Sequence, residues 1–297
     1  MIVMSVRMSV RMLLVFSILV GACEQHDTPA PVPTPTPAKP PAVAPVVDAG
    51  EPRGEVIVEW APPKPGTSST VGFDAKLDLD MNFGGMAILT SSVQKKKKKV
   101  QIVAVEPDGT VLKRITYLVR DTKVLVDGEP RKDVTPIRGK TYLVSWKAGT
   151  VTGVLHDDRK PATEEEVVAV RKEEAQLHAP DALGAALSGM RFVEGEPFEV
   201  PIAVLEKMIQ GTYKPKRVVL TYRGKTPEGS QIDAEGVFTN EGEGTLRFNL
   251  ELKGTLLIDH TGWCREAKVT GQVRAELNGS VVGSGAGSGT VTATPLR

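Results

Sequence analysis

Five consecutive lysines, Lys95–Lys99, form the densest concentration of charge in this sequence of 297 residues. Lysine ammonium groups bind phosphate oxygens, so one interpretation is a patch for the phosphates of lipid or lipopolysaccharide headgroups. In a β-strand, successive lysines place charge on both faces, which favours an exposed sheet edge or hairpin end where lysine blocks edge-to-edge pairing. We expect the solvated edge and keep the headgroup patch as the alternative. Its candidate ligands are Lys95, Lys96, Lys97, Lys98 and Lys99.

Other residue patterns give little support for catalysis or metal binding. The four histidines are scattered and lack the H-E-x-x-H or Cys/His spacing of zinc sites. Asp78 and Asp80 begin like a calcium loop, but Phe83 stands where that loop needs glycine. The sequence has no nucleophile elbow and no phosphate-binding glycine loop before a helix. We therefore expect no metal, no cofactor and no enzymatic activity, and the alternative is a hydrolase built around His156 or His260.

The N-terminus has the order of features found in exported proteins. Arg7 and Arg11 precede an apolar run of nine residues, Met12–Val20. This run fits the apolar core of a signal peptide, and it is shorter than the roughly 20 residues of a membrane span. Two small residues and Cys23 follow directly.

The segment Val20-Gly-Ala-Cys23 resembles the lipobox of bacterial lipoproteins. The resemblance implies cleavage before Cys23, a diacylglyceride on its thiol, and acylation (typically palmitate) of the new amino group. A membrane, reached through acyl chains on Cys23, is then a partner, because two or more chains anchor a protein stably. The expected location is the cell envelope, with the outer membrane facing the periplasm favoured over the inner membrane or the cell surface. The alternative is an ordinary secretory signal followed by an unrelated cysteine.

Composition and charge narrow the class of protein further. The chain has 37 Lys+Arg against 36 Asp+Glu, a net charge of +1 that becomes −1 once Arg7 and Arg11 are removed. This balance does not favour nucleic acid as a partner, nor adhesion to anionic lipid through global charge. With Cys23 acylated, Cys264 has no partner in the chain. We expect it to be a packed thiol, and a reactive or intermolecular thiol is the alternative.

Composition divides the chain into three segments. Residues 1–22 are the predicted signal peptide, 23–54 the lipidated cysteine with a proline-rich tether, and 55–297 a β-rich domain. Nine prolines between Pro29 and Pro52 favour extended polyproline II structure. Such a tether is a semi-rigid stalk with a reach on the order of 90 Å. A docking site for a proline-binding partner is the alternative.

The folded segment alternates apolar and polar residues, which predicts antiparallel strands. In Phe73–Phe83, every second residue is apolar and the residues between are Asp, Lys or Asn. Asn278-Gly279 predicts a two-residue hairpin. Val281–Thr290 has so little side-chain mass that it is either a weak strand permitting close approach of another backbone or a flexible loop. The other predicted strands are 55–60, 100–106, 111–120, 123–126, 141–146, 217–223, 231–239, 245–253, 255–259, 267–277 and 289–294.

A helical insert is predicted at about 163–210. Thr163 and Glu166 form a capping box at the start of a helix that ends near His178. Asp181 can cap a second short helix through Leu187. A third candidate, 201–210, has proline at its start and glycine after its end.

The order of strands, helices and strands behind a lipobox resembles the lipoprotein-localisation (LolA- and LolB-like) carriers. That resemblance implies a curved antiparallel half-barrel plugged by helices, with an interior that holds a lipid or acyl chain. We predict a mainly β (α+β) fold: a curved antiparallel sheet or half-barrel with a few helices inserted mid-chain. The expected function is that of a lipid-anchored envelope lipoprotein whose non-catalytic domain binds a lipid or apolar ligand. The alternative is an envelope scaffold or adhesion module without a ligand cavity.

Overall fold

The computed structural model describes residues 54–59, 61, 64–83, 85–132, 136–147, 150–176, 187–208, 213–241 and 246–296. The predicted signal peptide, Cys23 and nearly all of the tether lie outside these residues. The short helix predicted at 181–187 also lies outside them, apart from Leu187. Among the described residues, no helix has the length and apolar character needed to cross a membrane.

Strands dominate both halves of the domain, with helices between them. The first half contains β1 (Glu55–Ile57), β2 (Ser68–Phe83), β3 (Met86–Val105), β4 (Val111–Val126), β5 (Glu129–Lys132), β6 (Thr141–Lys147) and β7 (Thr150–His156). The middle contains α2 (Glu164–Gln176), β8 (Arg191–Val193), β9 (Pro197–Glu199) and α4 (Ile202–Met208). The second half contains β10 (Tyr213–Thr226), β11 (Gly229–Glu241), β12 (Leu246–Ile258), β13 (Cys264–Leu277) and β14 (Ser280–Pro295).

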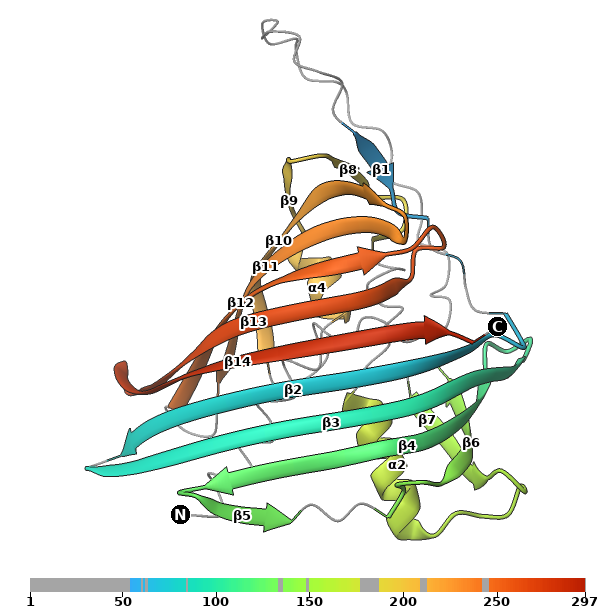
Figure 1. The fold of residues 1–297 in the computed structure, drawn as a ribbon, viewed down its shortest axis with the longest axis horizontal. Helices are drawn as coiled ribbons and strands as arrows, with labels where there is room; N and C mark the ends of the chain where they lie inside the picture. Colours follow the sequence, from blue (N-terminus) through green and yellow to red (C-terminus); the bar gives the residue numbers. More distant parts are fainter. Residues whose placement is uncertain are drawn as a thin grey trace, which may run out of the picture.

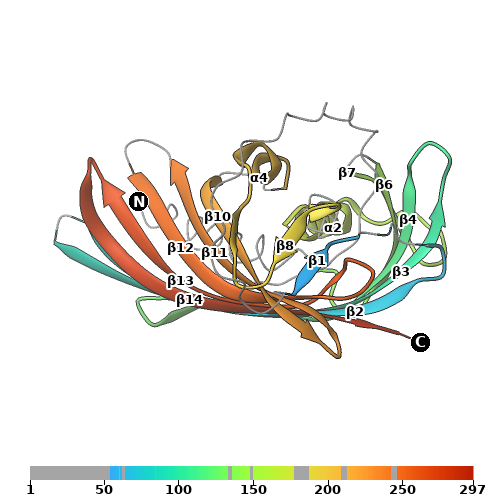
Figure 2. The ribbon, with the colours of Figure 1, turned by 90° about the horizontal axis from the view of Figure 1, so that it is seen from above.

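One 12-stranded antiparallel sheet forms the body of the domain (Figure 1). Its strand order is β7-β6-β4-β3-β2-β14-β13-β12-β11-β10-β9, with β5 paired to β4, and β1 pairs separately with β8. The sheet is curved and open, and β2 pairs with β14 where its two halves meet (Figure 2). The predicted fold class is confirmed.

Alternation along the strands separates the two faces of the sheet. The inner face, as we call the concave face that carries α2 and α4 (Figure 2), receives Phe73, Leu77 and Met81 of β2. Asp74 and Asp80 of the same strand point to the exposed outer face. Several strands are longer than predicted. β4 and β12 each unite two segments that were predicted separately, and β3 covers Met86–Val105 where only 100–106 was predicted.

The glycine-rich segment is a central strand, so the close-approach interpretation is confirmed and the loop is not. β14 lies between β13 and β2, and a Cβ added at Gly285 would come 2.3 Å from the carbonyl oxygen of Asp78. The predicted hairpin before it is also present, with positive φ angles of 52° at Asn278 and 80° at Gly279.

The two described helices begin where their capping residues predict. The Thr163 amide donates to the Glu166 carboxylate at 2.9 Å, and the Glu166 amide donates to the Thr163 hydroxyl at 3.3 Å, which completes the capping box before α2. α4 begins directly after Pro201. The backbone of α2 lies against β7 and that of α4 against β10, so the helices sit toward opposite edges of the sheet.

The lysine run does not lie at a sheet edge, and that prediction is wrong. Lys95–Lys99 lies in the interior strand β3, which pairs with β2 on one side and β4 on the other. Charge does fall on both faces, as the alternation requires. The inward lysines are accommodated because acidic side chains of α2 lie above them.

Candidate functional site

A row of polar side chains crosses the inner face along β3. We call it the β3 polar stripe. Apolar residues of the neighbouring strand β2 pair with it in register, from Val71 beside Lys98 to Leu79 beside Thr90. The stripe therefore lies beside an apolar row of equal length. Its members are Thr90, Ser92, Gln94, Lys96 and Lys98.

At one end of the stripe, Lys98 meets α2. Its Nζ lies 3.1 Å from Oε1 and 3.2 Å from Oε2 of Glu174. The hydroxyl of Tyr117 on β4 donates to the same carboxylate at 2.7 Å. Lys98 is 5% exposed and Glu174 is 3% exposed, so this ion pair is buried.

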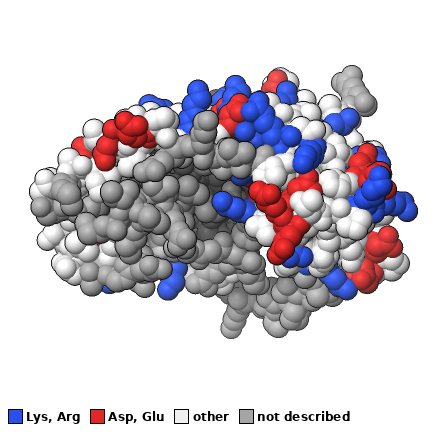
Figure 3. Space-filling model, turned by 90° about the horizontal axis from the view of Figure 1, so that it is seen from below, with Lys and Arg blue, Asp and Glu red and all other residues white. Residues whose placement is uncertain are grey.

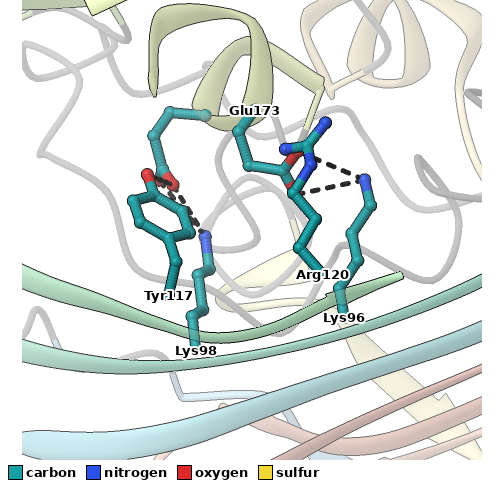
Figure 4. Close-up of polar contacts among 6 residues, drawn as sticks. Lys96, Lys98, Tyr117, Arg120 and Glu173 are labelled. Atoms are coloured by element: carbon teal, nitrogen blue, oxygen red, sulfur yellow. Dashed lines mark hydrogen bonds and ion pairs between the residues drawn. The ribbon is translucent and has the colours of Figure 1, made fainter. Parts of the chain in front are cut away.

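One position along, Lys96 and Arg120 share the carboxylate of Glu173. Figure 4 shows both side chains rising from the sheet toward this glutamate. The Nζ of Lys96 lies 3.1 Å from Glu173 Oε1, and Nη1 of Arg120 donates to Oε2. The ammonium of Lys96 also lies 5.6 Å from the centre of the Phe73 ring. We call Lys96, Lys98, Tyr117, Arg120, Glu173 and Glu174 the α2–sheet cluster.

Burial and charge act differently on Lys96 and Glu173, the two partners of one ion pair. Burial raises the pKa of the Glu173 carboxyl, but the positive charges of Lys96 and Arg120 outweigh it and hold that pKa below its ordinary value. Burial lowers the pKa of Lys96, because the attraction of Glu173 does not compensate for it and Arg120 repels it. The environment therefore favours the charged form of the glutamate and disfavours that of the lysine.

Three buried polar atoms of β3 and β4 make no hydrogen bond: Nε of Arg120 within the cluster, and Oγ of Ser92 and Oγ1 of Thr90, which lie about 13 and 20 Å from Lys96 along β3. Buried polar groups without partners are uncommon in proteins and costly. A small void of about 20 Å³ adjoins the cluster. Its lining combines the polar Lys96, Tyr117, Arg120 and Glu173 with the apolar Val71, Phe73, Val119 and Val291.

A third carboxylate of α2, that of Glu166, is held by a different set of groups. Lys140 donates to it at 2.7 Å, the Tyr142 hydroxyl at 3.0 Å, and Nε2 of His156 lies 3.2 Å away. The hydrogen bond from Lys140 is the main reason that the pKa of Glu166 falls to about 2. The hydroxyl of Thr163 bonds to the same carboxylate at 3.1 Å, so these groups form the start of the helix.

The outward lysines of the run lie in a different environment. Lys95, Lys97 and Lys99 are exposed on the outer face, where Lys95 lies 3.9 Å from Asp74. Viewed from below, basic and acidic side chains intermingle on the described part of the surface (Figure 3). The structure thus divides the predicted five-lysine patch between two faces.

A hollow of about 950 Å³ lies away from the cluster. It opens on the outer face and is lined by residues of β2, β3, β4 and β11–β14. Asp78, which lines it, already pairs with Lys76 at 2.7 Å and accepts from Ser91 at 2.7 Å. We place the candidate site on the inner face, where buried ion pairs and polar atoms without hydrogen bonds lie beside apolar residues.

Two other predicted residues lie away from this site. Cys264 is a buried free thiol whose Sγ donates to the carbonyl oxygen of Glu266 at 3.3 Å, as expected for a packed cysteine. His260 is exposed in the turn between β12 and β13. Cys23 lies outside the described residues.

Sequence reasoning missed the acidic half of the site. Glu166, Glu173 and Glu174 recur with Val170 at the spacing i, i+4, i+7, i+8, which is one stripe of a helix. An amphipathic helix normally buries apolar residues at that spacing. The combination of an acidic stripe and a lysine run elsewhere in the chain is the signal that could have paired them.

Comparisons with known proteins do not assign a family. No protein-family model and no curated protein sequence matches the chain significantly. A solved structure concerned with lipid–protein interactions in lipovitellin is 9% identical with a TM-score of 0.42, covering 77% of this chain and 25% of that one. An outer membrane channel from Pseudomonas putida F1 is 8% identical with a TM-score of 0.19, covering 83% and 99% respectively. This chain thus spans about a quarter of the lipovitellin chain, and likenesses this low carry no functional argument.

Proposed function

We propose that this protein is a lipid-anchored lipoprotein of the cell envelope whose curved sheet binds a lipid or another apolar ligand on its inner face. The domain is non-catalytic in this proposal. Acyl chains on Cys23 hold it to the membrane, with the outer membrane facing the periplasm as the favoured location, and the proline-rich segment is the stalk.

The observation that carries the proposal is the breadth of the apolar inner face. Eleven of the twelve strands lie side by side, and a spacing of about 4.8 Å makes the sheet roughly 50 Å wide. The longer described helix, α2, has 13 residues and is about 20 Å long. Apolar side chains that point to this face from the middle of the sheet include Phe73, Leu77, Leu79, Met81, Phe248, Leu250, Leu252, Val269 and Val273.

The positions of the helices support the same function. α2 and α4 lie toward opposite edges of the sheet, on β7 and β10, and the central strands lie between them. These apolar side chains are 5% exposed or less, so an acyl chain placed along the central strands would replace part of their present cover. Each methylene group buried in this way contributes about 0.8 kcal/mol.

Native mass spectrometry and lipid extraction test the ligand. The full chain, purified from bacterial membranes in a non-ionic detergent, should carry a lipid beyond its covalent anchor or acquire one from added lipid. Repeated absence of both would contradict ligand binding and leave the envelope scaffold or adhesion module as the function.

The anchor has a separate test. Globomycin, which blocks lipoprotein signal cleavage, and the substitution Cys23→Ala should each prevent normal processing of the chain. The Cys264→Ala variant is the matched control and should be processed and membrane-associated like the wild type. Unchanged processing in the presence of globomycin would contradict the anchor.

A further inference from the structure

The fully buried side chains of the helix α2 are mainly charged, and the partly buried Val167 and Ala169 pack against the core beside them. The residues of its buried stripe are Glu166, Val170, Glu173 and Glu174, so three of the four are acidic. Glu173 and Glu174 contact cations of β3 and β4, and Glu174 also accepts from the Tyr117 hydroxyl of β4. This is an unusual way to fix a helix permanently, because well-packed apolar residues are commonly at least as stabilising as a buried ion pair.

A charged interface also makes separation easier. If α2 leaves the sheet, water can solvate its glutamates and the opposing lysines, and the fully buried apolar residue uncovered on the helix is Val170. Each exposed surface would then carry charged groups beside apolar ones, with Val167, Ala169 and Val170 on the helix and Phe73 on the sheet. The contacts therefore fit a helix that binds the sheet reversibly better than they fit a helix that is a permanent part of the core.

The groups left on the sheet form a receptor for an anion. Lys96, Lys98 and Arg120 are directed to one side of β3 and β4, where Tyr117 adds a hydroxyl donor (Figure 4). The Nε of Arg120 is buried without a hydrogen bond, and so are the hydroxyls of Ser92 and Thr90 further along the stripe. An anionic group larger than a glutamate carboxylate could reach the Arg120 Nε that α2 leaves unused, whereas the hydroxyls of Ser92 and Thr90 lie about 13 and 20 Å from Lys96 along β3.

Apolar residues adjoin these donors directly. Phe73 pairs in register with Lys96, Leu77 with Ser92 and Leu79 with Thr90. The void at the cluster has apolar walls from Val71, Phe73 and Val291. A ligand bound here would meet cations with its head and the apolar row of β2 with its chain.

We propose that the inner face binds an amphiphile with an anionic headgroup, a phosphate or a carboxylate, and that α2 is an acidic lid whose Glu173 and Glu174 occupy the headgroup position in the unliganded protein. The headgroup binds to Lys96, Lys98 and Arg120 and displaces the two glutamates. This inference rests on the proposed function, since it specifies the ligand of the same inner face.

Matched ligands test the proposal on the full wild-type chain, in one detergent, by native mass spectrometry. Oleate is compared with oleyl alcohol, and dioleoyl phosphatidic acid with dioleoylglycerol. Each anionic ligand that fits should bind about tenfold more tightly than its neutral counterpart, because charge-assisted hydrogen bonds are lost in the neutral one. A preference confined to one pair identifies the carboxylate or the phosphate as the headgroup. Equal binding within both pairs would overturn the proposal.

Substitutions in α2 test the lid. Glu173→Gln with Glu174→Gln removes the competing carboxylates and should raise the affinity for the preferred anionic ligand about tenfold, with a smaller effect on its neutral counterpart. The control, Glu164→Gln with Glu165→Gln, makes the same charge change on the exposed side of the helix and should leave affinity within about twofold. Equal effects of the two double variants would contradict the lid.

The outcomes separate this inference from the proposed function. If no ligand of either kind binds to the wild type or the variants, ligand binding itself fails. If neutral and anionic ligands bind equally, the lipid-binding function stands and the headgroup site is wrong. The comparison on the wild type remains decisive even if the glutamine variants are unstable.

Discussion

The inner face of the sheet differs between its two halves, which meet at the β2–β14 pair. In the second half, β10–β13 bury side chains such as Leu220, Phe238 and Leu250, and Asn240 is the described exception. In the first half, β3 and β4 bury Gln94, Lys98 and other polar residues. The apolar half is suited to hold the fold together, and the mixed half adds a charged surface that a helix covers. The first half also buries apolar residues such as Ile115, Tyr142 and Trp146, so the two halves differ in the polar groups that the first half adds.

The largest effect is expected in the apolar half. Phe238→Ala removes a fully buried ring and should lower the free energy of unfolding by about 3–5 kcal/mol. Urea denaturation of the full chain in detergent measures this change. The neighbouring Val237→Ala, whose side chain points to the outer face, should cost much less. Similar losses in both variants would show that the two faces are not distinguished as described.

In the mixed half, a single substitution should lower the stability of the protein more than a substitution of both partners of an ion pair. Lys98→Met leaves the Glu174 carboxylate buried without its main cation and should destabilise the protein by about 3 kcal/mol. Adding Glu174→Gln keeps an acceptor for Tyr117 and should restore stability to within about 1 kcal/mol of the wild type. Thermal unfolding measures both.

The control for this pair is Lys97→Met, which removes an exposed lysine from the same strand. Its stability should stay within about 0.5 kcal/mol of the wild type. If the paired variant were as unstable as Lys98→Met alone, the buried contact would not be the reason for the loss.

Acid should weaken the docking of α2. The folded-state pKa of Glu166 is about 2, below the ordinary value of 4.5, chiefly because Lys140 donates to its carboxylate, with Tyr142 and Thr163 as further donors and His156 beside it. Its stabilising contribution is therefore complete above about pH 4.5 and is lost as the pH falls toward 2. Unfolding measured from pH 6 to pH 2.5 should show a steeper fall for the wild type than for Glu166→Gln. Parallel curves would contradict this role, and the exposed Glu165→Gln should follow the wild type.

The smallest effect is expected at the start of α2. Thr163→Ala removes the hydroxyl that accepts from the Glu166 amide and should destabilise the helix by about 1 kcal/mol. Hydrogen exchange of the α2 amides measures this change locally. Faster exchange in α2 with little change in β12 would support a helix that opens separately from the sheet, whereas equal changes would indicate that helix and sheet open together.

The sequence predicted many of the β elements because their signals are local, but no strand was predicted for β7 or for residues 86–94 of β3. Alternation in Phe73–Phe83, the hairpin at Asn278-Gly279 and the capping box at Thr163 each depend on a few neighbouring residues. The site was not predicted, because its parts are brought together by pairing across the sheet. Lys98 and Glu174 are 76 positions apart, and a lysine in an interior strand becomes tolerable only when its partner is known. The sequence alone therefore predicts a sheet edge for Lys95–Lys99. The alternation of side chains along a strand does predict that Lys96 and Lys98 lie on the opposite face from Lys95, Lys97 and Lys99.

Hydrogen exchange of α2 in the presence of ligand tests the central claim most directly. The full wild-type chain is labelled with no ligand, with oleate or dioleoyl phosphatidic acid, and with their neutral counterparts oleyl alcohol and dioleoylglycerol. The account predicts that the preferred anionic ligand speeds exchange at 164–176, because its headgroup displaces Glu173 and Glu174, and that its neutral counterpart leaves this exchange unchanged. A bound anionic ligand that leaves α2 as protected as in the free protein would contradict it.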